Sequence, residues 1–375
     1  MRHVRTVEVH VGGGRGGRHD GAGQSPETRL ERDDAGDAKA RIESVGVHAF
    51  QHTWRVDRRA TFAAMDTKYR IGVMPGVWPS DPDGREYLWH FIDLCERTEI
   101  DSVWFSERLS SPLPVPEPMT TMAAVAARTR HLKFGPSVLI TPFRPPAVMA
   151  REIAMIDYIS GGRMLPAVGV GVEQDREFRA AGVPFKERAR RTDEAIRIMR
   201  ACWTGEEVTI KGEFWDLERI TVLPRPIQDP IPLWIGGNSE AAMRRAGRLG
   251  DGWIPSFITP QQFRVGVEKT QAFAAEAGRE VPVDHFGALF YYCLHEDPKA
   301  AAAMAAPFVP RNRVDDAALA QCTAFGPADL VRERLEEYVN GGGSKFILRP
   351  MCPSDRVLDQ IERLAVEVVP DFHAR

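Results

Sequence analysis

The amino-acid sequence predicts an α/β protein whose parallel strands close into a (β/α)8, or TIM, barrel. From residue 69 onward, short apolar runs alternate with segments of helical periodicity, and eight such runs are present. The runs are mostly continuous rather than alternating, which is typical of parallel strands covered by helices. Eight is the number of strands that closes a barrel. An open doubly wound sheet is the competing arrangement, but no glycine-rich turn follows the first strand, as that fold usually requires.

Each expected strand is a short apolar run that ends at turn residues. The strands are expected at 69–74, 102–105, 132–140, 164–170, 231–235, 252–255, 286–294 and 345–348. The spacing of apolar residues predicts helices at 86–97, 119–126, 145–156, 187–203, 239–249, 327–339 and 358–368. An insertion at 204–226, rich in β-forming and turn residues, separates the fourth helix from the fifth strand.

Residues 1–64 are expected to lie outside the barrel domain, which spans 65–375. Gly, Arg and Asp dominate the first 40 residues, and such a composition cannot bury enough apolar surface to offset the entropy of ordering. We therefore expect a disordered extension, or a start site assigned upstream of Met65. Gly12, Gly14 and Gly17 fit G-x-G-x-x-G, but we expect no strand before them and no apolar-faced helix after them, as a dinucleotide site needs.

Composition excludes several classes of function. A net charge of −3 gives no support to nucleic acid or an anionic membrane surface as a partner, and no apolar run reaches the roughly 20 residues of a membrane helix. The five cysteines are scattered without a CxxC pair, so we expect no disulfide framework and a cytoplasmic location. The histidines form no HExxH or H-x-H pattern, so no metal is expected. A hydrolase triad lacks its G-x-S-x-G motif.

Candidate site residues lie where the expected strands end, because catalytic and binding groups of a barrel gather there. The candidates are Glu107 and Arg108 after the second strand, Ser137 and Val138 within the third, Gly169, Gly171 and Glu173 after the fourth, Gly236, Gly237 and Asn238 after the fifth, and Trp253 at the end of the sixth.

The loop after the fifth strand is the most informative of these. Glycine lets the backbone approach a ligand closely, and the first N–H groups of a helix lack internal partners. Gly236-Gly237-Asn238 before a helix therefore predicts a phosphate site. An ordinary helix cap by Asn238 or Ser239 is the alternative. Gly169-x-Gly171 clears space at the same end of the barrel and favours a ligand.

Glu107 with Arg108 is open to three interpretations: a catalytic pair, a cofactor anchor or a rim ion pair. Glu173 is open to the same three. Arginine stays protonated at all ordinary pH values, so we expect Arg108 to anchor a ligand rather than to accept a proton. Glu107 could balance that charge, or act as a general base if burial raises its pKa.

Several of these segments together resemble the bacterial luciferase-like monooxygenase family. DSVWFSE, the run from MTTMAAV to SGGRM, VGVG, and PLWIGGNSEAAMRRAGRLGDGW occur in the order of the family. The similarity is dense over residues 69–260 and looser up to 370. The resemblance implies a TIM barrel, an FMN or F420 cofactor at the C-terminal face of the strands, and an insertion after the fourth helix.

The resemblance also implies roles for individual residues. It implies a bulge with a non-proline cis peptide bond at Ser137–Val138, behind the cofactor ring. It places the cofactor phosphate on Gly236 and Gly237. It also places Gly169 and Gly171 along the side chain of the cofactor. In the F420-dependent sugar-phosphate dehydrogenases of this family the second strand ends in Asp-His, and that histidine is catalytic. Here Glu107-Arg108 stand there, and the proton-donating glutamate of those enzymes falls near Val172 or Glu173, so that activity does not carry over.

The sequence therefore predicts a luciferase-like, flavin- or F420-dependent oxidoreductase or monooxygenase that carries out two-electron redox chemistry on a small organic substrate. No nicotinamide site is found, so electrons are expected on F420 itself or, with FMN, from a separate reductase. A homodimer is one expected assembly. Two other functions stay open: a TIM-barrel lyase or isomerase that acts on a phosphorylated small molecule, and a non-catalytic flavin- or F420-binding relative.

Overall fold

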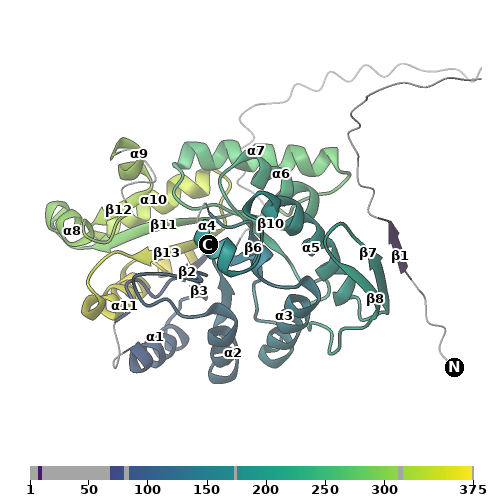
Figure 1. Cartoon of the computed structure of the whole chain (residues 1–375). Helices are drawn as coiled ribbons and strands as arrows, with labels where there is room; N and C mark the ends of the chain where they lie inside the picture. Colours follow the sequence, from purple (N-terminus) through teal and green to yellow (C-terminus); the bar gives the residue numbers. More distant parts are fainter. Residues whose placement is uncertain (1–6, 11–67, 80–83, 173–174, 311–315, 374–375) are drawn as a thin grey trace, which may run out of the picture. The chain divides into compact units, whose positions relative to one another are not determined.

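The computed structural model describes residues 7–10, 68–79, 84–172, 175–310 and 316–373. The core is the predicted eight-stranded parallel barrel (Figure 1). Its strands are β2 (Arg70–Val73), β3 (Ser102–Phe105), β4 (Lys133–Pro136) continued by β5 (Leu139–Ile140), β6 (Ala167–Gly169), β9 (Trp234–Gly236), β10 (Gly252–Ile254), β11 (Gly287–Leu294) and β13 (Lys345–Pro350). Isolated parallel bridges join its two sheets: one between Phe134 and Met164, and two on the other side, Trp253 to Phe286 and Ser256 to Leu289.

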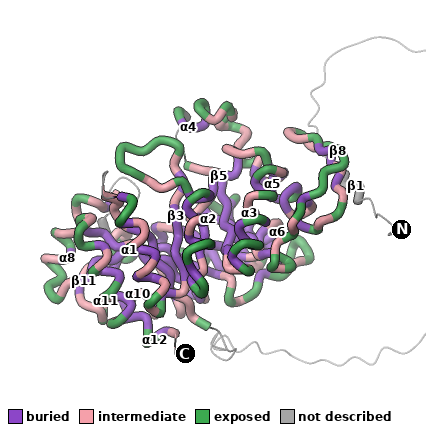
Figure 2. The backbone as a smooth tube through the Cα atoms, turned by 90° about the horizontal axis from the view of Figure 1, so that it is seen from below, coloured by how far each residue is buried: buried purple, intermediate pink, exposed green. Residues whose placement is uncertain are grey.

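Seven predicted helices surround the barrel close to their expected bounds. They are α1 (Gly84–Arg97), α2 (Pro118–Arg128), α3 (Pro146–Ser160), α5 (Arg188–Trp203), α6 (Glu240–Leu249), α10 (Ala328–Asn340) and α11 (Val357–Glu367). The tube view shows these helices outside the buried strands, with exposed residues on their outer faces (Figure 2).

Several elements were not predicted. They are α4 (Asp175–Ala180), α7 (Pro260–Glu276), α8 (Pro298–Ala305), α9 (Asp316–Gln321), α12 (Pro370–His373) and β12 (Thr323–Gly326), which pairs with β11. The longest, α7, has a clear start signal: the Thr259 side chain accepts from the Gln262 N–H and the Gln262 side chain accepts from the Thr259 N–H. This capping box, with Pro260 at the first helical position, is readable in the sequence and was missed.

The predicted insertion folds as an antiparallel hairpin of β7 (Val208–Lys211) and β8 (Asp216–Ile220). Buried Glu194 of α5 holds its turn, because the carboxylate accepts the N–H groups of residues 213, 214 and 215 at 3.0–3.1 Å. Of the expected N-terminal extension, only β1 (Val7–His10) is described, and it pairs in parallel with β7. A strand was not expected before Gly12; its Val-x-Val alternation is the signal. The boundary at residue 65 lies outside the described residues.

Large aromatic side chains fill the barrel, and glycines on neighbouring strands make room for them. A Cβ atom at Gly72 or at Gly135 would lie 2.8 Å from an atom of Trp104. A Cβ atom at Gly252 would lie 2.7 Å from Trp234. Trp104 is fully buried, as expected of a core residue rather than a ligand-stacking one. The interior is thus packed up to the level of the strand ends, where the loops begin.

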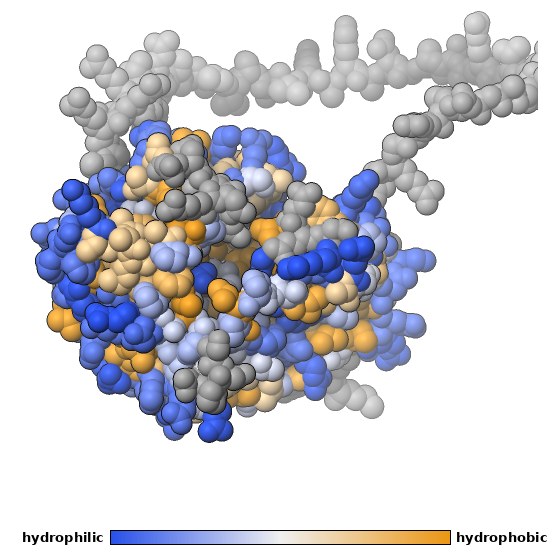
Figure 3. Space-filling view, turned by 60° about the vertical axis from the view of Figure 1, so that its left-hand side comes forward, coloured by the Kyte–Doolittle hydropathy of each residue, from blue (hydrophilic) through white to orange (hydrophobic). Residues whose placement is uncertain are grey.

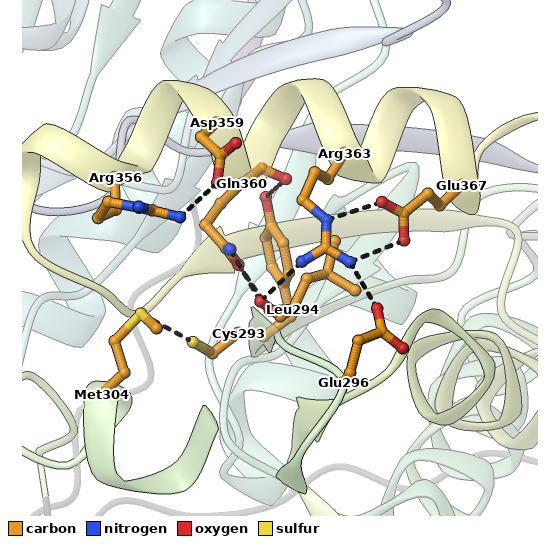
Figure 4. A network of polar contacts seen from close by, with 10 residues as sticks. Cys293, Leu294, Glu296, Met304, Arg356, Asp359, Gln360, Arg363 and Glu367 are labelled. Atoms are coloured by element: carbon orange, nitrogen blue, oxygen red, sulfur yellow. Dashed lines mark hydrogen bonds and ion pairs between the residues drawn. The ribbon is translucent and has the colours of Figure 1, made fainter. Parts of the chain in front are cut away.

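Helix α11 is fixed to the end of β11 by one buried glutamine. The Gln360 side chain accepts the Leu294 N–H at 2.6 Å and donates to the Leu294 carbonyl at 2.9 Å (Figure 4). The Tyr292 hydroxyl donates to the Gln360 carbonyl at 3.2 Å. Tyr292 therefore points outward from β11 to the helix layer, and its neighbour Tyr291 points into the barrel, because successive strand residues face opposite sides.

Charged groups close the opposite end of the barrel, where the strands begin. The Asp101 carboxylate forms ion pairs with the Lys345 ammonium at 2.9 Å and with the Lys133 ammonium at 3.0 Å. Burial would raise the pKa of Asp101, but these two ammonium groups outweigh it and hold the pKa well below its usual range. His373 of α12 accepts the Ile71 N–H at 3.1 Å, which ties the C-terminal segment to β2. This end serves stability rather than chemistry.

Candidate active site

The third strand of the barrel breaks at a cis peptide bond between Ser137 and Val138, as predicted. The Val138 side chain reaches over the ends of β6 and β9. A Cβ atom at Gly169 or at Gly236 would lie 2.7 Å from a Val138 methyl carbon. Both glycines therefore make room for Val138 in the first place, whereas the sequence analysis expects them to make room for the cofactor directly. Together the four residues form the floor of the barrel mouth.

Glu107 follows β3 and is locked onto the segment after this bulge. It is only 8% exposed. One carboxylate oxygen accepts the Ile140 N–H and the other accepts from the Arg144 guanidinium. Arg144 also contacts Glu117, the cap of α2, at 2.8 Å. The partner found for Glu107 is thus Arg144, a residue that the sequence did not single out, rather than its neighbour Arg108.

Burial sets the protonation behaviour of Glu107. Desolvation raises its pKa, and the attraction of Arg144 and the Ile140 N–H offset that rise only in part. The nearby Glu152 carboxyl also has a raised pKa, because it is desolvated and lies near Glu117. A carboxyl group whose pKa is raised by burial can serve as a general base near neutral pH.

The loop after β9 leaves several backbone N–H groups without an acceptor in the described part of the chain. Gly237 has a φ of 121°, which side-chain-bearing residues rarely adopt. The N–H groups of Gly237, Asn238 and Ser239 donate to no acceptor among the residues that the structure describes. All three residues are exposed. These donors stand just before α6, where the helix dipole also favours an anion.

Side chains around this loop hold it in place. The Asn238 amide donates to the Ser256 carbonyl at 2.6 Å and accepts the Ser256 N–H at 3.2 Å. Ser239 caps α6 by accepting the Ala242 N–H at 3.2 Å. The helix-cap interpretation is therefore realised by Ser239, and the open N–H groups lie alongside it. The Asn238 side chain is thus turned toward Ser256, while its backbone N–H stays open with respect to the described residues.

Trp253 does not lie where a cofactor contact requires. It is fully buried between β10 and α7, where it stacks on Phe263 at 5.7 Å. A Cβ atom at Gly266 of α7 would clash with the indole, so this face of β10 is packed against the helix. Its Nε1 donates to the Gly237 carbonyl at 2.9 Å. Trp253 therefore supports the loop at Gly237 from behind.

The other predicted residues have mixed outcomes. Gly171 has a φ of 78° and packs against Ile140 and Phe178, so it shapes the loop after β6. Arg108 is half-buried beyond the end of β3, at the mouth. Glu173 lies outside the described residues.

One face of the molecule is hollowed (Figure 3). The space-filling view shows a face that is hollowed near its centre, with hydrophobic side chains in and around the hollow and hydrophilic ones farther out (Figure 3). Over the described ranges, no three His, Cys, Asp or Glu side chains come together as a metal site would need. No helix in this part of the chain is both long and apolar enough to cross a membrane.

Comparison with known proteins identifies the family. The model of the luciferase-like monooxygenases matches residues 67–313, which is more than half of the chain. The protein belongs to this family.

Individual relatives agree with that assignment. An F420-dependent glucose-6-phosphate dehydrogenase of Amycolatopsis mediterranei is 36% identical over 182 residues, which are 46% of this chain and 53% of the relative. The chain thus spans about half the length of the curated relatives it matches.

Solved structures share the fold. The coenzyme F420-dependent tetrahydromethanopterin reductase of Methanopyrus kandleri superposes with a TM-score of 0.67 at 22% identity, over 81% of this chain and 99% of that one. The oxygenating constituent of 3,6-diketocamphane monooxygenase from Pseudomonas putida, in complex with FMN, gives 0.67 at 19% identity, over the same shares.

Proposed function

We propose that this protein is an oxidoreductase that binds F420 or FMN at the barrel mouth and carries out two-electron redox chemistry on a small organic substrate. The observation that carries the proposal is the joint placement of two features at one end of the barrel. One is the Val138 side chain over Gly169 and Gly236, and the other is the set of open N–H groups of residues 237–239. The first offers a shaped apolar floor and the second a phosphate site. A flavin or deazaflavin needs both.

The residues at the mouth fit such a cofactor. Gly237 and Asn238 would take its phosphate through their N–H groups. Val138 would lie beneath the ring system of the cofactor. Gly169 and Gly236 leave the space that its side chain occupies. When bound, the cofactor supplies the hydride-accepting or hydride-donating centre. Glu107 would hold or receive the accompanying proton on its carboxylate, and Arg108 would anchor an anionic group.

The relatives support the cofactor class more than the substrate. F420 or FMN appears in the names of relatives and of structures with this fold. Glucose-6-phosphate oxidation is not proposed, because Arg108 stands where those dehydrogenases place a catalytic histidine and a guanidinium cannot accept a proton. If FMN is the cofactor, a separate reductase would supply its reduced form. The five cysteines are free and buried, which supports a reducing cytoplasm.

A side-by-side titration of both cofactors tests the proposal. We expect F420 or FMN to bind with a Kd in the micromolar range or below, about −8 kcal/mol, as measured by quenching of cofactor fluorescence. A lyase or isomerase that uses the same loop for a phosphorylated substrate would bind neither ring system. A non-catalytic relative would bind one of them but would not turn over. Failure of both cofactors to bind the full-length protein would refute the proposal.

We further propose a homodimer that packs through α3. Val148, Met155 and Ile159 form an apolar stripe along one face of this helix, and each is more than 40% exposed. The start of α3 also lines a groove of about 260 Å³ with the β7–β8 hairpin, so that the apolar surface continues beyond the helix. Exposed apolar surface of this kind is typical of protein–protein contacts when it is contiguous.

Met155→Glu places a charge in the middle of this stripe, so we expect it to convert a dimer to a monomer. Val366→Glu on α11, where the valine is 71% exposed and isolated, is the matched control and should leave the assembly unchanged. Size-exclusion chromatography with light scattering gives the mass. A wild-type mass of one chain, or a dimer that persists in Met155→Glu, would contradict the interface.

A further inference from the structure

Arg349 of β13 is a cation at the barrel mouth with no carboxylate partner among the described residues. It is in register with Tyr291 of β11, which points into the barrel. The guanidinium carbon lies 5.8 Å from the centre of the Tyr291 ring, and one terminal nitrogen donates to the Gly76 carbonyl at 3.2 Å. The Tyr291 ring in turn meets Phe257 edge-on at 4.2 Å. Two aromatic rings and the loop after β2 therefore hold the guanidinium in place.

The charge of Arg349 is not balanced by the part of the chain that the structure describes. Its Nε is buried and has no acceptor there, and no carboxylate of this part lies within ion-pair distance. Two other arginines with little exposure do have one: Arg144 contacts Glu107, and Arg245 contacts Asp193. Arg163, in contrast, is half-buried without a carboxylate partner in the described ranges, but it donates to several carbonyl oxygens, which Arg349 does there through one nitrogen only. A guanidinium that is partly out of water costs free energy unless an anion or further acceptors meet it. The fork of donors suits a carboxylate or a phosphate.

Arg349 lies too far around the barrel from the loop at Gly237 for both to bind the same anion. Strands β10 and β11 lie between β13 and β9 on the shorter way around the barrel. Three strand spacings correspond to about 14 Å of sheet. An anion on Arg349 is therefore a different group from a phosphate on the Gly237 loop, and it enters the mouth from the other side.

We propose that Arg349 binds the anionic group, a carboxylate or phosphate, of the organic substrate, so that the enzyme acts on organic anions. That the bound anion is a substrate rests on the proposed function. The anion site itself does not depend on that function. Arg349 would orient the substrate by a two-pronged contact while Gly76 and Tyr291 keep the guanidinium in position.

The test compares a charged probe with a neutral one of the same shape. Benzoate, and separately inorganic phosphate, should raise the melting temperature of the wild-type protein, whereas benzamide should not. In Arg349→Met, which is neutral and of similar length, benzoate affinity should fall roughly tenfold to a hundredfold, as expected for a lost charged hydrogen-bonding pair. Arg349→Lys keeps the positive charge but loses the planar fork of donors. Its benzoate affinity should lie between those of the wild type and Arg349→Met. Arg356→Met is the control, because Arg356 is exposed and already pairs with Asp359 at 3.1 Å.

Two further readouts separate this site from other roles. Without added anion, Arg349→Met should melt no lower than wild type, because it removes a half-buried charge that no described carboxylate meets. A clear loss of stability would mark Arg349 as a structural residue and overturn the proposal. F420 and FMN affinity should stay within about threefold of wild type, well under the tenfold that 1.4 kcal/mol represents. A larger loss with an unchanged benzoate response would assign Arg349 to the cofactor instead. If neither cofactor binds the wild type but benzoate binding depends on Arg349, the proposed function fails and the anion site stands.

Discussion

Replacing Glu107 by Gln is expected to lower turnover of the cofactor-loaded enzyme by roughly a hundredfold to ten thousandfold, the usual contribution of a positioned acid or base. The fold should survive the change. The oxygen of the new amide would still accept the Ile140 N–H, and Arg144 would keep its contact with Glu117. The loss therefore falls on proton transfer rather than on the position of the bulge.

The pH dependence identifies the group. Glu107 must be ionised to act as a base, so turnover should fall as the pH drops through its pKa, which burial raises above the ordinary 4.5. This acid limb should vanish in Glu107→Gln. In Arg144→Gln it should move to higher pH, because the positive charge that lowers the pKa is gone. A carboxyl-carbon NMR titration, with the Glu107 signal assigned by its loss in Glu107→Gln, checks the pKa directly.

Glu117→Gln is the matched control for this series. Glu117 also contacts Arg144 but is exposed, and glutamine keeps the oxygen that accepts the Thr120 N–H. Turnover should be kept in this variant, and its acid limb should remain but move to lower pH, because the Glu117 charge helps to raise the pKa of Glu107. If Glu107→Gln unfolds the protein or leaves the acid limb in place, Glu107 is a structural tie between β3 and the segment after the bulge, and another group carries the proton.

The order of strands and helices in the barrel could be predicted, because each strand and most helices leave a periodic pattern of apolar residues within their own segment. The eight strands and seven helices follow from apolar spacing within windows of a few residues. α7 shows that a local signal can still be overlooked, since Thr259-Pro260-x-Gln262 specified its start. β1 was missed for a different reason: two valines in a Gly- and Arg-rich segment form a strand only because the edge of β7 receives them.

The site was predictable only as far as its residues lie at strand ends. Val138 packs against Gly169 and Gly236 at this end of the barrel, a contact that the sequence did not predict. What periodicity cannot supply is the contact between side chains far apart in the chain. Arg144 is 37 residues from Glu107, and no local pattern links them. For the same reason Trp253 was assigned to the ligand: its strand-end position was right, but its side chain faces α7.

Arg349, which meets no carboxylate among the described residues, is a further feature that sequence alone hides. An arginine in an apolar strand is ordinary if a carboxylate meets it, and only the fold tells whether one does. Arg144 and Arg349 both lie near the mouth; Glu107 neutralises the first, and no carboxylate of the described ranges neutralises the second. The two sides of the mouth therefore differ: the β3–β5 side carries a bound carboxylate suited to proton transfer, and the β13 side carries a cation suited to holding an anion.

Replacing Gly237 by Val is expected to weaken F420 or FMN binding by roughly tenfold to a hundredfold, since charge-assisted hydrogen bonds contribute about 1.5–3 kcal/mol each. At a φ of 121°, a side chain strains the backbone, and its Cβ would lie 3.0 Å from the Ala242 Cβ. The loop must then shift, and its N–H groups no longer converge on one anion. Backbone strain alone costs about 1–3 kcal/mol of stability, so the melting temperature should also fall.

Gly278→Val is the matched control for the loop, because Gly278 has a φ of 66° and a Cβ there would meet nothing within 4 Å. This variant should lose stability by strain but keep cofactor affinity. Asn238→Ala offers a milder test, because it frees the loop from Ser256 without adding bulk, and it should weaken binding without strain. Isothermal titration with each cofactor measures all three variants. If Gly237→Val folds and binds as tightly as Gly278→Val, the phosphate does not dock on this loop.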